Sequence, residues 1–310
     1  MQDTYVTVNG VRLHCVTAGP ATQSDTDAPL MMFLHGFPEF WYEWKAQLRE
    51  FAKDHLVVAP DMRGYNLSDK PAEVDAYRVP ALIEDIRGLA DHFRTGKKFV
   101  LVAHDWGGAL AWVFAMAYPE ALEKLIIINA PHPKIFRELL ASDPGQQQAS
   151  QYMLLFRSPM AEAQLTANNY GALTEVVLGE LLRSGKLTET DKAEYVKAWS
   201  QPGALTGGLN YYRASAVGPP APTEIEKEIG KSAADFGLTG DDGARADACD
   251  LGRKGRGTDR EEPGWVGAVC AGADGEARGG RFALGGARKA GGSERIHSGV
   301  CPVEIAAGFD

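Results

Sequence analysis

Short apolar runs alternate with amphipathic stretches through residue 128 of the chain. The apolar runs favour strands, and the stretches between them repeat their apolar positions at helical spacing. Strands are predicted for residues 11–17, 30–34, 55–60, 98–103 and 122–128. Helices are predicted for residues 41–53, 79–94 and 108–118. This alternation predicts an α/β fold with a mostly parallel central sheet that helices cover on both faces.

The pattern changes after this region, because residues 134–212 carry helical periodicity with few strand signals. Proline and glycine divide the region into several short helices. These breaks fall at Pro159, Gly171, Gly185, Pro202 and Gly203. The pattern predicts a helical cap inserted into the sheet domain. We therefore expect a core at 1–133, a cap at 134–215 and a return to the core at 216–242.

The composition shifts sharply from about residue 240. The last 71 residues, 240–310, hold 17 of the 35 glycines and three of the four cysteines. Hydrophobic periodicity disappears there, and no short repeat explains the glycines. Residues 243–310 are predicted to be an aberrant, disordered tail, so the last strands and helix of the fold are expected to be missing.

Charge and cysteine spacing exclude several functional classes. A net charge of −9 argues against nucleic acid and against an acidic membrane surface as partners. No apolar run approaches the roughly 20 residues that span a bilayer. The chain start has no secretory signal pattern, and no cysteine pair has metal-ligand spacing. We therefore expect a cytoplasmic protein without a metal or other cofactor.

The predicted strand at 98–103 runs directly into a turn and a helix. Ala103 and Gly107 supply the small residues that a sharp strand-to-helix turn needs, and Asp105 stands at its centre. A carboxylate is ionised at neutral pH, so Asp105 can attack an electrophilic carbon and form an ester without a base. The backbone N–H of Trp106 would then face the ester oxygen. The alternative is that Asp105 only caps the following helix.

A second turn, after the predicted strand at 30–34, can complete an oxyanion site. Gly36 allows the chain to turn closely, and Pro38 fixes the exit. The backbone N–H of Phe37 can therefore point at the same oxygen as that of Trp106. Alone, this turn is an ordinary strand-to-loop connection; together with the Asp105 turn it indicates catalysis.

Five segments of the chain resemble the epoxide hydrolase family of the α/β-hydrolase fold. They are HGFPEFWYEW (35–44), DMRGYNLSDKP (61–71), AHDWGGALAW (103–112), INAPHP (128–133) and GGLNYYRA (207–214). The resemblance runs to about residue 242 without a large gap. It implies that Asp105 opens a small apolar epoxide and that water completes the reaction. One departure is Asn66, where the family commonly has glycine and where Asn tolerates left-handed backbone.

The same resemblance implies two cap tyrosines that hydrogen-bond the epoxide oxygen, by position Tyr152 and Tyr212. Ring opening produces an alkoxide, and a phenol can donate a proton to it as the charge develops. The alternative for either tyrosine is a packing role with its hydroxyl in water.

The residues that should hydrolyse the ester are missing. Hydrolysis needs a His base and a carboxylate that orients it. In the family these follow W-G-x-x-D-like and S-H-W-like motifs, and neither motif occurs here. His297 lacks the flanking pattern and is interpreted as a loop residue in solvent. An earlier acid position found in some relatives corresponds to Asn129, which is not a carboxylate. Turnover by this chain is therefore not expected.

The tail becomes similar to the family when its gene is read one base later. With chosen wobble bases, 246–252 can read P-T-L-V-I-W-G, 253–257 can continue as G-K-D-G, and 281–284 can read D-S-H-W. The acid and the His then occur in the family order. We interpret the chain as frameshifted near Gly243.

Two other functions remain open. Haloalkane or haloacetate dehalogenases use the same Asp nucleophile, but haloalkane dehalogenases usually have Asn where Phe37 stands. The haloacetate enzymes carry Arg beside the nucleophile, where this chain has Gly107 to Leu110. The other alternative is a non-catalytic binding protein that kept the pocket and lost the base.

Overall fold

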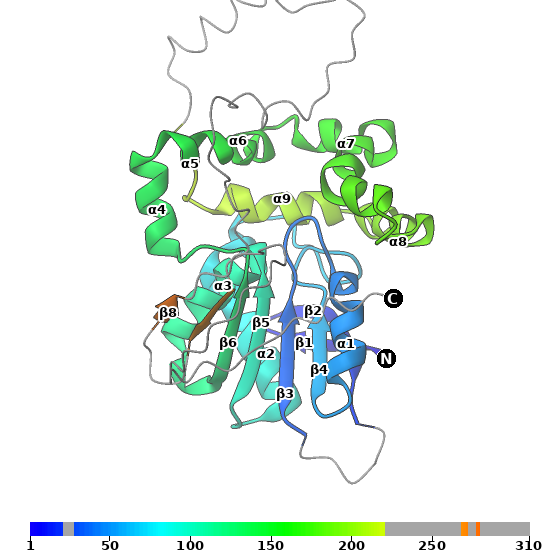
Figure 1. The fold of residues 1–310 in the computed structure, drawn as a ribbon, viewed down its shortest axis with the longest axis vertical. Helices are drawn as coiled ribbons and strands as arrows, with labels where there is room; N and C mark the ends of the chain where they lie inside the picture. Colours follow the sequence, from blue (N-terminus) through cyan, green and yellow to red (C-terminus); the bar gives the residue numbers. More distant parts are fainter. Residues whose placement is uncertain (21–27, 221–267, 272–276, 280–310) are drawn as a thin grey trace, which may run out of the picture.

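The computed structural model describes residues 1–20 and 28–220, together with the backbone of 268–271 and 277–279. A twisted sheet with helices on both faces forms the lower part of the molecule, and a layer of helices lies across its upper end (Figure 1). The predicted α/β fold with a mostly parallel sheet is confirmed.

The sheet has the strand order β1-β2-β4-β3-β5-β6-β7-β8. Its first six strands are β1 (Gln2–Val8), β2 (Val11–Ala18), β3 (Leu30–Leu34), β4 (Leu56–Pro60), β5 (Phe99–His104) and β6 (Leu122–Ile128). The central strands β4, β3, β5 and β6 are parallel, whereas β1 and β2 form an antiparallel hairpin. The sequence analysis missed β1, although the Asn9-Gly10 turn with φ of 48° and 76° is typical of a two-residue hairpin.

Alternate residues of each buried strand contact helices on opposite faces of the sheet. Met31 and Phe33 of β3 pack with Trp44 and with α1 (Lys45–Phe51) on one face. The other face packs on α2 (Val79–Arg94) and α3 (Asp105–Ala117). Short 3-10 turns are η1 (Trp41–Trp44), η2 (Val74–Tyr77) and η3 (Pro119–Ala121). Both faces are covered as predicted, and the carboxyl ends of β3 and β5 point at the upper helical layer (Figure 1).

The helical layer consists of the six helices that follow β6 in the chain. They are α4 (Pro133–Ser142), α5 (Pro144–Ala149), α6 (Tyr152–Arg157), α7 (Ala161–Arg183), α8 (Glu189–Trp199) and α9 (Ala204–Ala214). A separate apolar cluster joins α7, α8 and α9 to Phe40 of the sheet domain. Helix α7 is kinked, because Asn168, Asn169 and Tyr170 have positive φ values. The sequence predicts helices in this region but not the kink.

Two short strands extend the sheet beyond β6. Strand β7 (Ala268–Ala271) pairs antiparallel with β6, and β8 (Ala277–Gly279) pairs antiparallel with β7. They lie in the segment for which the sequence predicts no element. The remainder of that segment and most of the expected return at 216–242 lie outside the described residues. In the described part of the chain, no helix has the length and apolar character needed to cross a membrane; the cytoplasmic location stays a prediction.

Candidate active site

Asp105 lies where β5 ends and α3 begins, with a left-handed φ of 47°. This conformation needs space on both sides. A Cβ on Gly107 would lie 2.6 Å from the carbonyl oxygens of His35 and Leu34, and a Cβ on Gly36 would lie 2.4 Å from the Cβ of Asp105. Only glycine fits at these two positions, so they allow the strained turn that presents the Asp105 side chain.

Two backbone N–H groups hold the Asp105 carboxylate. Phe37 N–H donates to Asp105 Oδ1 at 2.9 Å, and Trp106 N–H also hydrogen-bonds the carboxylate. Burial raises the pKa of Asp105 above its ordinary value, and the two N–H groups oppose that shift. The N-cap of α3 is His104, and Asp105 is the first helical residue. The contact with Phe37 comes from the loop after β3, so helix capping does not account for this geometry.

Tyr152 and Tyr212 reach the same place from the helical layer. Tyr212 of α9 is 3% exposed, and its ring packs edge-on against Trp106 and Phe37 at centroid distances of 5.2 and 5.4 Å. Tyr152 of α6 is 45% exposed, with its ring 6.2 Å from that of Tyr212. Burial and then the negative charge of Asp105 raise the pKa of both phenols, that of Tyr152 to about 12.

The neighbouring Tyr211 belongs to the core instead. Its hydroxyl donates to the carbonyl of Arg63 at 2.8 Å and is fully buried. Among the described residues, the hydroxyls of Tyr152 and Tyr212 have no such acceptor. The structure therefore brings Asp105, Phe37, Trp106, Tyr152 and Tyr212 together, with no acceptor for either phenol among the described residues.

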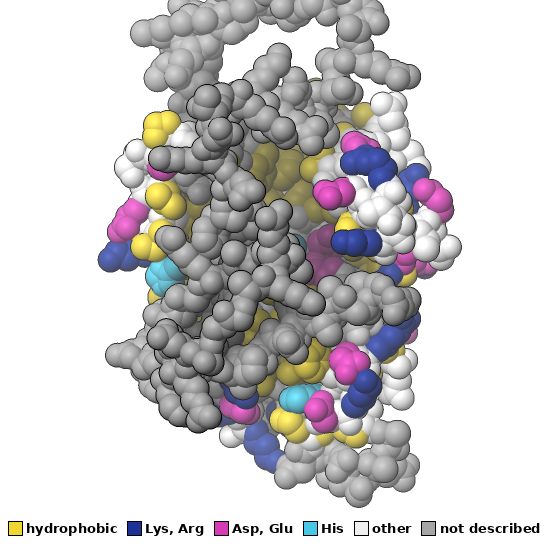
Figure 2. Space-filling view, viewed as in Figure 1, with side chains coloured by type: hydrophobic (Ala, Val, Ile, Leu, Met, Phe, Trp, Pro, Cys, Tyr) yellow, Lys and Arg dark blue, Asp and Glu magenta, His cyan; other side chains and the backbone are white. Residues whose placement is uncertain are grey.

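The space between the sheet and the helical layer is apolar. Phe156 packs against Phe37, Tyr152 and Tyr212 with centroid distances of 5.0 to 5.3 Å. Figure 2 shows hydrophobic side chains deep in the hollow below the helical layer, with acidic side chains beneath them and further charged side chains on the outer surface. Such walls would accommodate an apolar molecule and weaken competition from water at the carboxylate.

A partly buried acid–imidazole cluster beside Asp105 was missed in the sequence. His104 Nδ1 lies 3.2 Å from Glu43 Oε1, and Glu39 is close to both. Burial lowers the pKa of His104, but the hydrogen bond and charge of Glu43 outweigh it and raise the pKa to about 8. Burial, followed by the charge of Glu43, raises the pKa of Glu39 to about 8. The Oε2 atoms of both glutamates are buried without a hydrogen-bond partner among the described residues.

The other predicted residues do not add a base. His297 lies outside the described residues, and Asn129 follows β6 as an exposed residue with φ of 49°. His35 is buried between the Gly36 carbonyl and the Met62 N–H, and burial lowers its pKa to about 4. In the described part of the chain, no group of three or more His, Cys, Asp or Glu residues is arranged to hold a metal ion.

Comparison with known proteins gives a consistent family. A family model described as the alpha/beta hydrolase fold matches residues 29–202. The AB hydrolase superfamily protein YfhM of Bacillus subtilis is 45% identical over 69% of this chain and 73% of its own length.

Two further similar proteins have epoxide hydrolase in their names. Epoxide hydrolase 4 of Mus musculus is 43% identical over 66% of this chain, and the match spans 57% of the mouse protein, less than two thirds of its length. The crystal structure of a Bacillus megaterium epoxide hydrolase in complex with an inhibitor is 38% identical, with a TM-score of 0.63, and the match covers 68% of this chain and 71% of that one. The rest of each of these two proteins lies outside its match to this chain.

Proposed function

The chain belongs to the alpha/beta hydrolase fold family, in its epoxide hydrolase group, and from this premise we propose that Asp105 opens an epoxide by forming an ester with it. One Asp105 oxygen bonds to a ring carbon while the C–O bond of the ring breaks. The freed oxygen takes a proton from Tyr212 or Tyr152. The product is a hydroxyalkyl ester that water would cleave to a vicinal diol and free Asp105.

The observation that carries this proposal is the position of the Asp105 carboxylate. It is half-buried, held by the Phe37 and Trp106 N–H groups, and faced by two phenols that have no acceptor in the described part of the chain. The N–H groups would stabilise the oxyanion when water attacks the ester. The phenols would stabilise the alkoxide when the ring opens. Each donor therefore matches a charge that develops in the reaction.

The domain division of the sequence analysis fits this role. We assign 1–133 to the core that carries Asp105 and 134–215 to a cap that supplies Tyr152 and Tyr212, with a return to the core at 216–242. A cap above the carboxyl end of the sheet encloses an apolar substrate and excludes bulk water. The reaction uses side chains and backbone groups of the protein, so it requires no cofactor.

The proposed reaction stops at the ester. Hydrolysis requires a base, and the family positions for that base and its acid fall in the segment that we interpret as frameshifted near Gly243. Without a base, water attacks the ester slowly. The chain would therefore accumulate an adduct instead of turning over.

Intact-mass measurement after incubation with a reactive epoxide tests the proposal. The expected result is one adduct equal to the whole mass of the epoxide, mapped to the peptide that contains Asp105. Asp105→Asn should form none, and it leaves the neighbouring turn unchanged. A haloalkane would instead add its mass less one hydrogen halide, so a faster reaction with haloalkanes would identify a dehalogenase. Absence of any adduct in a folded protein would favour a non-catalytic binding protein.

A further inference from the structure

We propose that one face of helix α8 positions the loop that carries the Phe37 donor, and that Trp199 is the main positioning residue on this face. The face consists of Asp191, Tyr195 and Trp199, and we call it the splint. The proposal rests on the proposed roles of Phe37 and Asp105, because it concerns what holds that donor in place.

The three residues are spaced four apart, so they share one face of α8. Each contacts a successive part of the chain that follows β3: the loop itself, then η1 and the start of α1. The Trp199 indole N–H donates to the Pro38 carbonyl at 2.7 Å. The Tyr195 ring packs edge-on against Phe40, with centroids 5.3 Å apart. One face of α8 thus contacts the loop at both Pro38 and Phe40.

The end of the splint at Asp191 is an ionic contact. Tyr42 donates to Asp191 Oδ1 at 2.7 Å, and Lys45 Nζ forms an ion pair with the same carboxylate. The other carboxylate oxygen accepts from the backbone N–H and the hydroxyl of Thr188 at 2.8 and 2.7 Å. Thr188 and Asp191 together form the capping box that begins α8. Asp191 therefore fixes both the helix and the loop.

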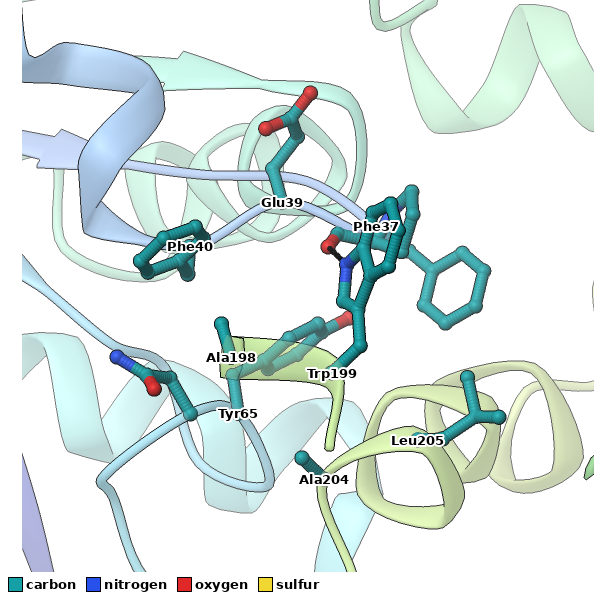
Figure 3. Close-up of a pocket in the computed structure, with 10 residues that line it drawn as sticks. Phe37, Glu39, Phe40, Tyr65, Ala198, Trp199, Ala204 and Leu205 are labelled. Atoms are coloured by element: carbon teal, nitrogen blue, oxygen red, sulfur yellow. Dashed lines mark hydrogen bonds between the residues drawn. The ribbon is translucent and has the colours of Figure 1, made fainter. Parts of the chain in front are cut away.

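Trp199 is the contact nearest to the chemistry. Its acceptor, Pro38, is the residue after Phe37, and Phe37 N–H donates to Asp105 Oδ1 at 2.9 Å. Both hydrogen bonds are made by the same short stretch of chain. Figure 3 shows the Trp199 indole against the loop beside Phe37, with the hydrogen bond as a dashed line and Glu39 pointing away. A shift of the Pro38 peptide would rotate the Phe37 donor away from the carboxylate.

The surroundings of Trp199 leave the loop little freedom. The indole is buried, and it lines a pocket of about 10 Å³ with Phe37, Phe40 and Tyr65. A pocket of that size holds roughly one water molecule. Replacing the indole with a smaller ring would enlarge the pocket and let water compete for the Pro38 carbonyl. The sheet-side donor of the site therefore depends on a residue of the helical layer 161 positions along the chain from that carbonyl.

Trp199→Phe in the full chain tests the proposal, because it removes the N–H and keeps a buried ring. Trp112→Phe is the matched control: Trp112 is also buried, and its N–H donates to the Ala130 carbonyl at 3.2 Å, away from the loop. Hydrogen exchange of peptides that contain the Phe37 amide is measured by mass spectrometry. Exchange should be about tenfold faster in Trp199→Phe and unchanged in Trp112→Phe, as expected from loss of one hydrogen bond.

The rate of adduct formation gives a second readout. Trp199→Phe should lower the maximal rate about tenfold with the half-saturating epoxide concentration unchanged, because the substrate walls remain. If Trp199→Phe does not fold, Tyr42→Phe takes its place, with about threefold faster exchange over the loop expected from the loss of its contact with Asp191.

Three results separate this proposal from the proposed function. Exchange at Phe37 that is equally fast in the Trp199 and Trp112 variants would overturn the splint, whatever the adduct rates are. Wild-type protein that forms no adduct but shows the selective change in exchange would overturn the reaction and support the splint. A fall in adduct rate with unaltered exchange at Phe37 would also overturn the splint, because Trp199 would then act by another route.

Discussion

The two tyrosines of the site lie in different surroundings, so their removal should have unequal effects. We predict that Tyr212→Phe slows adduct formation far more than Tyr152→Phe. Tyr212 is 3% exposed and packed between Trp106 and Phe37, whereas Tyr152 is 45% exposed. A buried donor is already oriented at the developing alkoxide, and water cannot replace it. A half-exposed donor can be replaced by a water molecule.

The magnitudes follow from this difference. Removing one preorganised donor from a water-excluded site costs about 10²- to 10³-fold in rate. Removing a hydrogen bond that water can replace costs on the order of tenfold or less. We therefore expect Tyr212→Phe to be slower by about two orders of magnitude and Tyr152→Phe by about one. Tyr152 has no hydrogen-bond partner among the described residues, so Tyr152→Phe should unfold within roughly 0.5 kcal/mol of the wild type. The Tyr212 hydroxyl accepts from the Trp106 side chain, so Tyr212→Phe should cost about 1 kcal/mol, as Tyr211→Phe does.

The assay is the maximal rate of adduct formation, measured by intact mass over a range of epoxide concentrations. Tyr211→Phe is the matched control, since Tyr211 is adjacent in sequence but donates to the Arg63 carbonyl in the core. It should lose about 1 kcal/mol of stability without loss of rate. The reasoning is refuted if Tyr152→Phe is the slower variant, or if Tyr211→Phe is as slow as Tyr212→Phe.

Three further predictions concern stability and turnover. The folded pKa of Glu39 is raised to about 8, so folding binds a proton between pH 4.5 and 8, and Glu39 alone should lower wild-type stability by roughly 2 kcal/mol from pH 6 to pH 8. His104, whose pKa is also raised to about 8, adds a smaller loss in the same window. Glu39→Gln should therefore reduce the loss in urea unfolding at the two pH values without abolishing it, and an unchanged slope would contradict the assignment. Gly107→Ala should destabilise the fold by more than about 2 kcal/mol, because its Cβ would collide with backbone atoms. Gly96→Ala is the control: its Cβ would meet no atom within 4 Å, so it should cost only roughly 1 kcal/mol for the left-handed backbone. Equal melting temperatures of the two variants would contradict this. A gene with its frame restored near codon 243 should produce diol over many turnovers, while repeated diol formation by the 310-residue chain would show that a base is present after all.

Local pattern was sufficient for the strands and helices that carry the nucleophile. Residues 79–94 and 122–128 were predicted with the observed bounds of α2 and β6, because their periodicity is strong. The turn at Asp105 was predictable because small residues must flank it. Asn66 has φ of 37°, which bears out the expectation that asparagine tolerates left-handed backbone there.

Features that depend on packing between distant segments were not predictable. The sequence shows only ordinary polar residues near turns at Glu39, Glu43 and His104. Their partial burial depends on the helical layer above them. The kink of α7 leaves the apolar pattern of a helix intact, so periodicity cannot reveal it. The pairing of Ala268–Ala271 with β6 joins a segment without strand pattern to a buried strand. For the glutamate–imidazole cluster and for β7, a partner lies far away along the sequence.

The two halves of the proposed reaction depend on different parts of the chain. Ring opening uses Asp105, Phe37, Trp106, Tyr152 and Tyr212, whose positions are set by contacts among β3, β5, α6, α8 and α9. Hydrolysis needs a base from beyond α9. Strand β7 pairs with only Leu125 to Ile128 of β6, so a change of sequence in the tail affects the sheet edge more than the carboxylate and its donors. A persistent ester is therefore what the proposed reaction predicts for this chain: general unfolding would abolish both steps, whereas loss of the base alone would abolish only the second.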